Sequence, residues 1–223
     1  MQTKLDAVMT ATLLVCAVTT TGVVLHREFM APHSLTRAQQ KPVLVPNWRV
    51  ALEKGIRMGS AQARVQLIEF ADFECPFCGS LHKTLETVRE RYPTQVALIY
   101  VHFPLPMHRF AVPAARVAEC AGDQGRFEAM YDQLFDGQES FGLRPWSDYA
   151  TAAGVPDLSE FDSCIKKLDP IPQVEDGKRL GTELDVKGTP TVIVNGWKLG
   201  HPPSAEELDA MVKAVLAGKS PVS

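Results

Sequence analysis

The chain has 223 residues, with 23 lysines and arginines against 26 aspartates and glutamates, and a formal net charge of −3 at pH 7. This length allows one well-buried domain with extensions, and the nearly balanced charge gives no electrostatic argument for nucleic-acid binding. The hydrophobic content of 45% is ordinary for a soluble globular protein, so composition alone excludes little else.

Residues 1–28 are expected to form a signal anchor or a signal peptide. Ala7 to Leu25 contain no charged residue and are long enough to cross a bilayer as a helix. A cleaved signal peptide is the main alternative, because the charged region before this stretch is short, and a buried core helix is the third. We favour an uncleaved anchor, since no convincing small-x-small cleavage site follows. Val15 also departs from the small residue that a lipoprotein signal has before its cysteine.

Residues 29–46 are polar and interrupted by prolines, which is typical of a tether. The folded domain is expected to occupy residues 47–219, with a short helix between Trp48 and Ile56. The stretch from Val65 to Ala71 is apolar, contains β-branched residues and lacks glycine and proline. This pattern predicts a mostly buried strand.

A helix is predicted directly after this strand, because Leu81, Leu85 and Val88 recur at helical spacing and Tyr92-Pro93 stops the pattern. The sequence Cys75-Pro76-Phe77-Cys78 therefore lies where a strand ends and a helix begins. The free backbone N–H groups and the positive end of the helix dipole stabilise a thiolate there. They can lower a cysteine pKa from about 8.5 by one to several units.

Two cysteines separated by two residues suit disulfide exchange, because one thiol attacks a substrate while the second waits to resolve the mixed disulfide. Cys75, nearer the helix entrance, is the expected nucleophile, and Cys78 is the expected resolving thiol. Pro76 fixes φ in the first helical turn. A half zinc site and two packing cysteines are the alternatives. We favour redox chemistry over zinc because the chain has no second C-x-x-C and the nearest histidine is His82.

Gln95 to Phe103 form a second apolar run, which predicts a neighbouring strand joined by a β-α-β crossover. Helical periodicity then predicts a helical subdomain inserted at about residues 107–185. Its apolar stripes, which we interpret as core, lie at Phe127 to Phe135, at Trp146 to Ala153 and at Phe161 to Leu168.

Ser159 is the expected N-cap of the third of these helices. Strand structure returns at Thr191 to Val194, where Asn195-Gly196 predicts a tight hairpin to Trp197 to Leu199. Ser204 and Glu207 predict a capping box for the last helix.

Three motifs, in this order and spacing, resemble the DsbA-like branch of the thioredoxin superfamily, the thiol:disulfide oxidoreductases of the bacterial cell envelope. The motifs are Glu69 to Cys78, the segment from Phe103 to Phe127, and Val186 to Thr191, and the match spans about residues 55–217. The resemblance implies an α/β thioredoxin fold with an inserted helical subdomain, preceded here by an N-terminal hydrophobic helix.

The resemblance also implies roles for residues far from the dithiol in the sequence. Thr189-Pro190 is the expected cis-peptide loop facing the cysteines, where the backbone of Thr189 pairs with an extended substrate; a trans proline beginning a strand is the alternative. Glu69 matches a buried acid that relays the proton of Cys78, and the alternative is an outward-facing residue in a surface salt bridge.

Cys120 and Cys164 lie on apolar faces of predicted helices, and some DsbA-like proteins carry a cysteine pair in these places. We therefore expect a second, structural disulfide, and the alternative is two reduced cysteines buried as small hydrophobic residues. With Cys75 and Cys78 the folded part has an even four cysteines, which suits an oxidising compartment.

These observations predict a thiol:disulfide oxidoreductase on the periplasmic side of the cell envelope, held by its N-terminal helix in the membrane. It would oxidise cysteines of exported proteins without a metal or organic cofactor, and a quinone-linked membrane partner would re-oxidise it. The strongest oxidases of the family have histidine where this chain has Phe77, so we expect moderate oxidising strength. A reductase or isomerase of the same fold, and a metal- or partner-binding module, are the rival functions.

Overall fold

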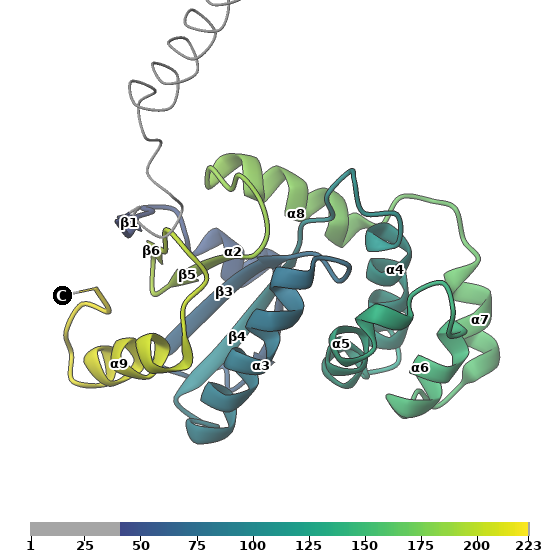
Figure 1. Ribbon diagram of the computed structural model, residues 1–223, viewed down its shortest axis with the longest axis horizontal. Coiled ribbons are helices and arrows are strands. Elements are labelled where there is room, and N and C mark those ends of the chain that lie inside the picture. The colour runs from purple at the N-terminus through teal and green to yellow at the C-terminus, as the bar shows by residue number, and fades with distance from the viewer. Residues whose placement is uncertain (1–40, 223) are drawn as a thin grey trace, which may run out of the picture. The chain divides into compact units, whose positions relative to one another are not determined.

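The computed structural model describes residues 41–222, and the expected membrane segment at 1–28 and the tether up to residue 40 lie outside them. Within the described residues, no helix is long and apolar enough to cross a membrane. Six strands of this part form one mixed sheet in the order β1-β6-β5-β3-β4-β2 (Figure 1). The strands are β1 Val43–Leu44, β2 Ile56–Gly59, β3 Val65–Ala71, β4 Val96–His102, β5 Thr191–Val194 and β6 Trp197–Lys198.

The two longest strands, β3 and β4, run parallel and are buried along their whole length. Strands covered on both faces carry nearly continuous apolar side chains, as the sequence of β3 does. The predicted bounds of β3 are confirmed, and helix α3, Pro76–Arg91, connects it to β4 as expected. The elements therefore follow the thioredoxin order, which is β3, α3, β4, a group of inserted helices, β5, β6 and α9.

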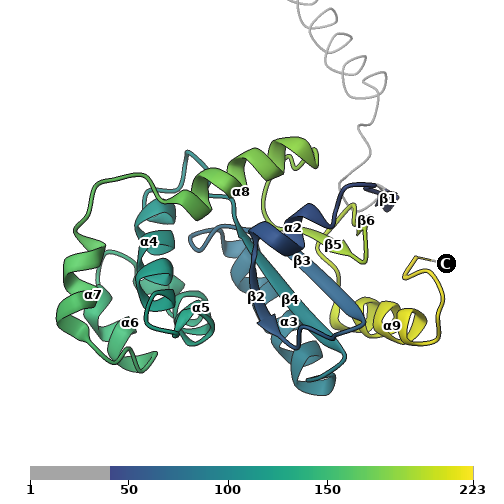
Figure 2. The same ribbon diagram turned by 180° about the vertical axis from the view of Figure 1, so that it is seen from behind.

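Helices cover both faces of the sheet, because successive side chains of a strand point to opposite sides. On one face, Leu67 packs in the same core as α3 and α9, Ala205–Leu216. On the other face, Ile68 packs in a second core with α2, Val50–Lys54, and α8, Pro172–Glu183. Figure 2 shows α2 and α8 on the side of the sheet opposite α3.

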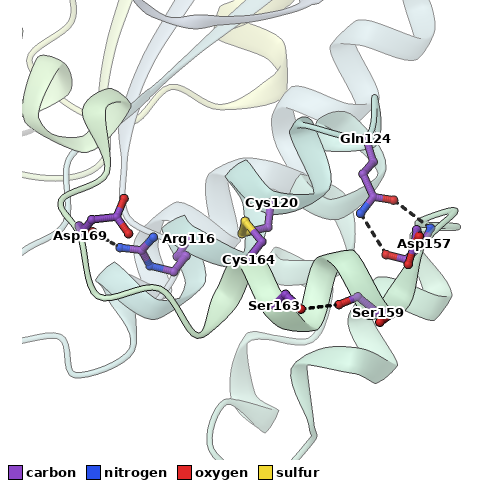
Figure 3. Close-up of a disulfide and its surroundings, with 8 residues drawn as sticks. All are labelled: Arg116, Cys120, Gln124, Asp157, Ser159, Ser163, Cys164 and Asp169. Carbon is purple, nitrogen blue, oxygen red and sulfur yellow. Dashed lines mark hydrogen bonds between the residues drawn. A yellow bond between two sulfur atoms is a disulfide. The ribbon is translucent and has the colours of Figure 1, made fainter.

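A layer of helices lies beside the sheet, at the end where α8 and α4 meet (Figure 1). It consists of α4 Ala111–Gly122, α5 Phe127–Asp136, the 3-10 helix η2 Gln138–Ser140, α6 Trp146–Ala152 and α7 Leu158–Ile165. A disulfide between Cys120 and Cys164 joins α4 to α7, with their Cα atoms 5.9 Å apart (Figure 3). The pair is thus bonded, not two reduced cysteines.

Helix α8 falls inside the range expected for the insertion but belongs to the sheet layer. A Cβ atom on Gly177 would lie 2.0 Å from the carbonyl oxygen of His102, so the helix backbone lies directly against the end of β4. Leu180 of α8 is buried in the same core as Ile68. The sequence could not show that α8 packs on the sheet, since its apolar residues recur with the same helical period as those of the inserted helices.

The N-terminal boundary also differs from the expectation. Val43 and Leu44 of the expected tether pair with Trp197 and Lys198, because β6 offers an open sheet edge. A strand that the sequence analysis did not predict lies between the short helix and β3: β2 pairs with β4, and its Met58 is only 2% exposed.

At α7 the expected cap is wrong. Asp157 caps this helix by accepting a hydrogen bond of 2.9 Å from the Glu160 N–H, and Ser159 lies inside the first turn. Asp157, two residues before Ser159, accepts the hydrogen bond from a free N–H group of the first turn and so takes the place of the expected cap. The helix ends at Ile165, so Leu168, assigned to its apolar stripe, is 98% exposed.

The C-terminal predictions are confirmed. Asn195 and Gly196 have φ of 44° and 95°, the left-handed values that a two-residue hairpin needs. Ser204 and Glu207 form the reciprocal capping box that begins α9.

Candidate active site

The four residues from Cys75 to Cys78 lie at the turn from β3 into α3. Cys75 is the N-cap residue with extended backbone angles, and Pro76 is the first residue of the helix. Asp72 shapes the turn before it: its Oδ1 accepts from the Glu74 N–H at 2.8 Å, and its carbonyl accepts from the Cys75 N–H at 3.0 Å. The sequence prediction that the dithiol lies at a helix start is therefore correct.

The two thiols differ in their proton affinity. Cys75 and Cys78 are unbonded, and 3% and 0% of their surfaces are exposed. A hydrogen bond from the Cys78 thiol, aided by the backbone N–H groups of Cys78 and Phe77, lowers the pKa of Cys75 to about 5. Burial raises the pKa of Cys78 well above its usual value. At neutral pH the site thus holds one thiolate and one thiol, as disulfide exchange requires.

The loop before β5 faces the dithiol. The Thr189-Pro190 peptide bond is cis, and the Thr189 carbonyl oxygen lies 3.7 Å from Cys75 Sγ. Pairing of β5 with β3 brings this loop next to the turn that carries Cys75. Residues separated by more than a hundred positions in the chain therefore meet at one sulfur atom.

Glu69 lies in the buried layer of β3 and is 0% exposed, so it is not an outward-facing strand residue. The Tyr131 hydroxyl donates a 3.0 Å hydrogen bond to its Oε2. Its Oε1 has no hydrogen-bond partner among residues 41–222. Burial raises the pKa of Glu69 to about 8, against the opposing effects of the Tyr131 hydrogen bond and the charge of Arg89. At neutral pH the carboxyl group is mostly protonated.

Sequence reasoning missed a contact from the helical layer to the active-site turn. The Gln138 amide donates to the carbonyl oxygen of Cys75 at 2.9 Å and to that of Phe73. Gly79 allows this approach, because a Cβ atom there would lie 2.7 Å from Gln138 Oε1. Gln138 is 63 residues from Cys75, and no local pattern marks it.

Tyr131 was interpreted only as part of an apolar core stripe. Its ring is core, packed against Tyr100, Phe135 and His82 with centroids 5.0 to 5.3 Å apart. Its hydroxyl is the polar group that reaches Glu69. A buried tyrosine usually needs a hydrogen-bond partner for its hydroxyl, so the tyrosine in this apolar stripe was the one sequence feature that could have indicated a polar contact.

The surface around Cys75 is partly apolar. Phe77 is 69% exposed and Met107 is 75% exposed. The loop that carries Met107 is tied to the active-site turn, since Asp72 Oδ2 accepts from the Leu105 N–H at 2.8 Å and lies 2.7 Å from His108 Nδ1. A pocket of about 580 Å³ opens beside the start of α3; its lining includes Pro76, Gly79, Lys83, Phe135 and Gln138.

Metal ligation was the chemical alternative for the dithiol. Among residues 41–222, no group of three or more histidine, cysteine, aspartate or glutamate side chains is placed to hold a metal ion. His82, the nearest histidine in sequence, is 2% exposed and stacks on Phe135 with ring centroids 5.3 Å apart. Burial lowers the pKa of His82, which favours its neutral form.

A family model described as thioredoxin matches residues 51–214 of this chain. A protein named Na(+)/H(+) antiporter NhaA 1, from Mycolicibacterium gilvum (strain PYR-GCK), is 35% identical over 167 residues. That match covers 72% of this chain and 26% of the relative, so the chain spans about a quarter of the length of the curated relatives it matches.

Solved structures share the fold at low sequence identity. BdbD from Bacillus subtilis in its oxidised form superposes with a TM-score of 0.67 at 18% identity, covering 80% of this chain and 100% of BdbD. The alpha-DsbA1 of Wolbachia pipientis superposes with a TM-score of 0.62 at 19% identity, covering 82% of this chain and 96% of that protein.

Proposed function

The chain belongs to the thioredoxin family and has a DsbA-like fold, and from this premise we propose that it is an extracytoplasmic thiol:disulfide oxidoreductase that oxidises exported proteins. The observation that carries the proposal is the difference between the two thiols: Cys75 is acidic at the helix start, and Cys78 behind it keeps its proton. This difference defines one attacking or leaving sulfur and one resolving sulfur.

The reaction begins from the Cys75–Cys78 disulfide. A substrate thiolate attacks Cys75 Sγ, the disulfide bond breaks, and Cys78 leaves as a thiolate that takes up a proton. A second substrate thiolate then attacks the substrate sulfur of the mixed disulfide, and Cys75 leaves as a stable thiolate. Two electrons have passed from the substrate to the enzyme, and the substrate has gained a disulfide. A quinone-linked membrane partner would remove these electrons.

The low pKa of Cys75 favours this direction. A sulfur with a pKa of about 5 is a good leaving group, and its stable thiolate favours the reduced enzyme, which makes the disulfide an oxidant. The side chain of Phe77 is mostly exposed, and its phenyl ring brings neither a charge nor a hydrogen bond to the sulfur. The enzyme would therefore be a moderate oxidant within its family.

Substrate binding in this proposal uses the cis-proline loop and the apolar surface next to it. The backbone of Thr189, whose carbonyl faces Cys75 Sγ, would pair with an extended segment of the substrate. Exposed side chains such as Phe77 and Met107 would contact apolar residues of the unfolded chain.

The proposed location is the periplasmic side of the cell envelope, with the uncharged stretch from Ala7 to Leu25 as a membrane anchor. The Cys120–Cys164 disulfide supports an oxidising compartment. Fractionation of cells with N-terminal sequencing tests the anchor, which predicts full-length protein in the membrane fraction. Soluble mature protein beginning beyond residue 20 would show cleavage instead.

The activity is tested by mixing the oxidised protein with a reduced, unfolded protein and following disulfide formation. Cys75→Ser should abolish exchange, and Cys78→Ser should trap mixed disulfides with substrates. The double variant is the matched control and should trap none. Insulin reduction without substrate oxidation would favour a reductase, and bound metal with neither activity would favour a binding module.

A further inference from the structure

The carboxyl group of Glu69 is held at one oxygen only. Tyr131, on α5 of the helical layer, donates its hydroxyl to Oε2 at 3.0 Å, while Oε1 is buried without a partner among the described residues. Glu69 and Tyr131 are both 0% exposed and are 62 residues apart in the chain. The tyrosine ring cannot move freely, because Tyr100 and Phe135 pack edge-on against it.

We propose that Tyr131 is a positioning residue for thiol exchange: its hydroxyl fixes one oxygen of Glu69, so that the other oxygen exchanges a proton with Cys78. This inference rests on the proposed function and extends it to the helical layer. The layer would then supply part of the proton transfer apparatus beneath the dithiol, in addition to covering the site.

The proton balance fits both directions of the reaction. When substrate thiolate opens the Cys75–Cys78 bond, Cys78 leaves with a negative charge and takes the proton of the neutral Glu69 carboxyl. When Cys78 attacks a mixed disulfide, its proton goes to the Glu69 carboxylate, and the substrate sulfur leaves from Cys75. In each case the phenol of Tyr131 keeps its own proton, because burial raises its pKa well above the usual value.

Charged and titratable groups of α3, its N-cap residue, β4 and α5 interact with Glu69. Arg89 of α3 favours the carboxylate, whereas negative charge on Cys75 disfavours it. The Cys78 thiol and the phenol of Tyr100 on β4 also interact with Glu69. Among these neighbours, Tyr131 is the one for which a direct hydrogen bond to the carboxyl group is described. Its removal should therefore make Glu69 hold its proton more tightly.

The test is Tyr131→Phe, which removes one oxygen and keeps the ring. A hydrogen bond to a charged group is worth enough to move a pKa by about 1 to 2 units, so the pKa of Glu69 should rise by that amount. The inflection in the pH dependence of thiol exchange should rise with it. Carbon NMR of the labelled glutamate side chain in reduced protein measures the pKa directly, and urea unfolding checks that the variant is folded.

Tyr149→Phe is the matched control. Tyr149 is also 0% exposed in the helical layer, but its hydroxyl donates to the Gly137 carbonyl at 2.7 Å, away from Glu69. This variant should leave both the Glu69 pKa and the exchange profile unchanged.

A second comparison separates positioning from a general effect on packing. In a Glu69→Gln background, Tyr131→Phe should not move the inflection, because the titrating group is gone. An equal shift there, or an unshifted profile in Tyr131→Phe alone with an active wild type, would overturn the role of Tyr131. A wild type without any thiol exchange would instead refute the proposed function.

Discussion

The Cys78 thiol is the largest cause of the low pKa of Cys75, so its removal gives a direct test of the electrostatic argument. Cys78→Ala deletes a hydrogen bond to a charged sulfur, worth about 1.5 to 3 kcal/mol. At 1.36 kcal/mol per pKa unit, the pKa of Cys75 should rise from about 5 by about 1 to 2 units. Cys78→Ser keeps a hydroxyl donor at the same place and should retain most of the lowering.

The assay is the pH dependence of alkylation of the peptide that contains Cys75, followed by mass spectrometry. Measuring this peptide alone avoids the signal of Cys16, and Cys120 and Cys164 are bonded to each other. Equal pKa values for Cys75 in the wild type and in both variants would refute the reasoning. The backbone N–H groups at the helix start would then be sufficient to account for the thiolate.

Phe77→His should lower the Cys75 pKa and raise the redox potential together, because histidine adds a positive charge and a hydrogen-bond donor. An unchanged Cys75 pKa would show that Phe77 does not account for the moderate oxidising strength. Glu69 keeps its proton up to about pH 8 in the folded protein against 4.5 for an ordinary glutamate. The reduced wild type should therefore lose up to about 5 kcal/mol of stability as pH rises between these values, and Glu69→Gln should lack this loss in urea unfolding of the reduced protein. Replacing Cys120 and Cys164 with alanine removes a disulfide between residues 44 positions apart and should lower the free energy of unfolding by about 4 kcal/mol in the chain-entropy model. Urea unfolding of the variant and of the wild type, with and without reductant, measures this difference.

The parts of the fold that the sequence predicted have local causes. The apolar run of β3, the Asn195-Gly196 turn and the Ser204 capping box each require only neighbouring residues, and each is confirmed. The position of Cys75 at the start of α3 follows from the same local patterns. The two-residue strand at Val43, in contrast, exists because β6 leaves an open edge, and nothing in its own sequence indicates it.

The parts of the site that the sequence missed depend on packing between distant elements. Tyr131 reaches Glu69, and Gln138 reaches the Cys75 carbonyl, only because α5 and η2 lie against α3. The dithiol spacing, together with the family resemblance, indicated the chemistry but not which groups tune it. Such side-chain contacts are fixed by tertiary structure, which periodicity alone does not specify.

The redox potential of the Cys75–Cys78 pair tests the proposed oxidase function most directly. Thioredoxin, with a nucleophile pKa of about 7, has a potential of about −270 mV. A Cys75 pKa of about 5 favours the reduced pair at pH 7 by a further factor of about 50, since a thiol of pKa about 7 is already half ionised there; at about 30 mV per tenfold change this predicts a potential near −220 mV. Equilibration with glutathione measures it. A value at or below that of thioredoxin would contradict the oxidase and favour a reductase.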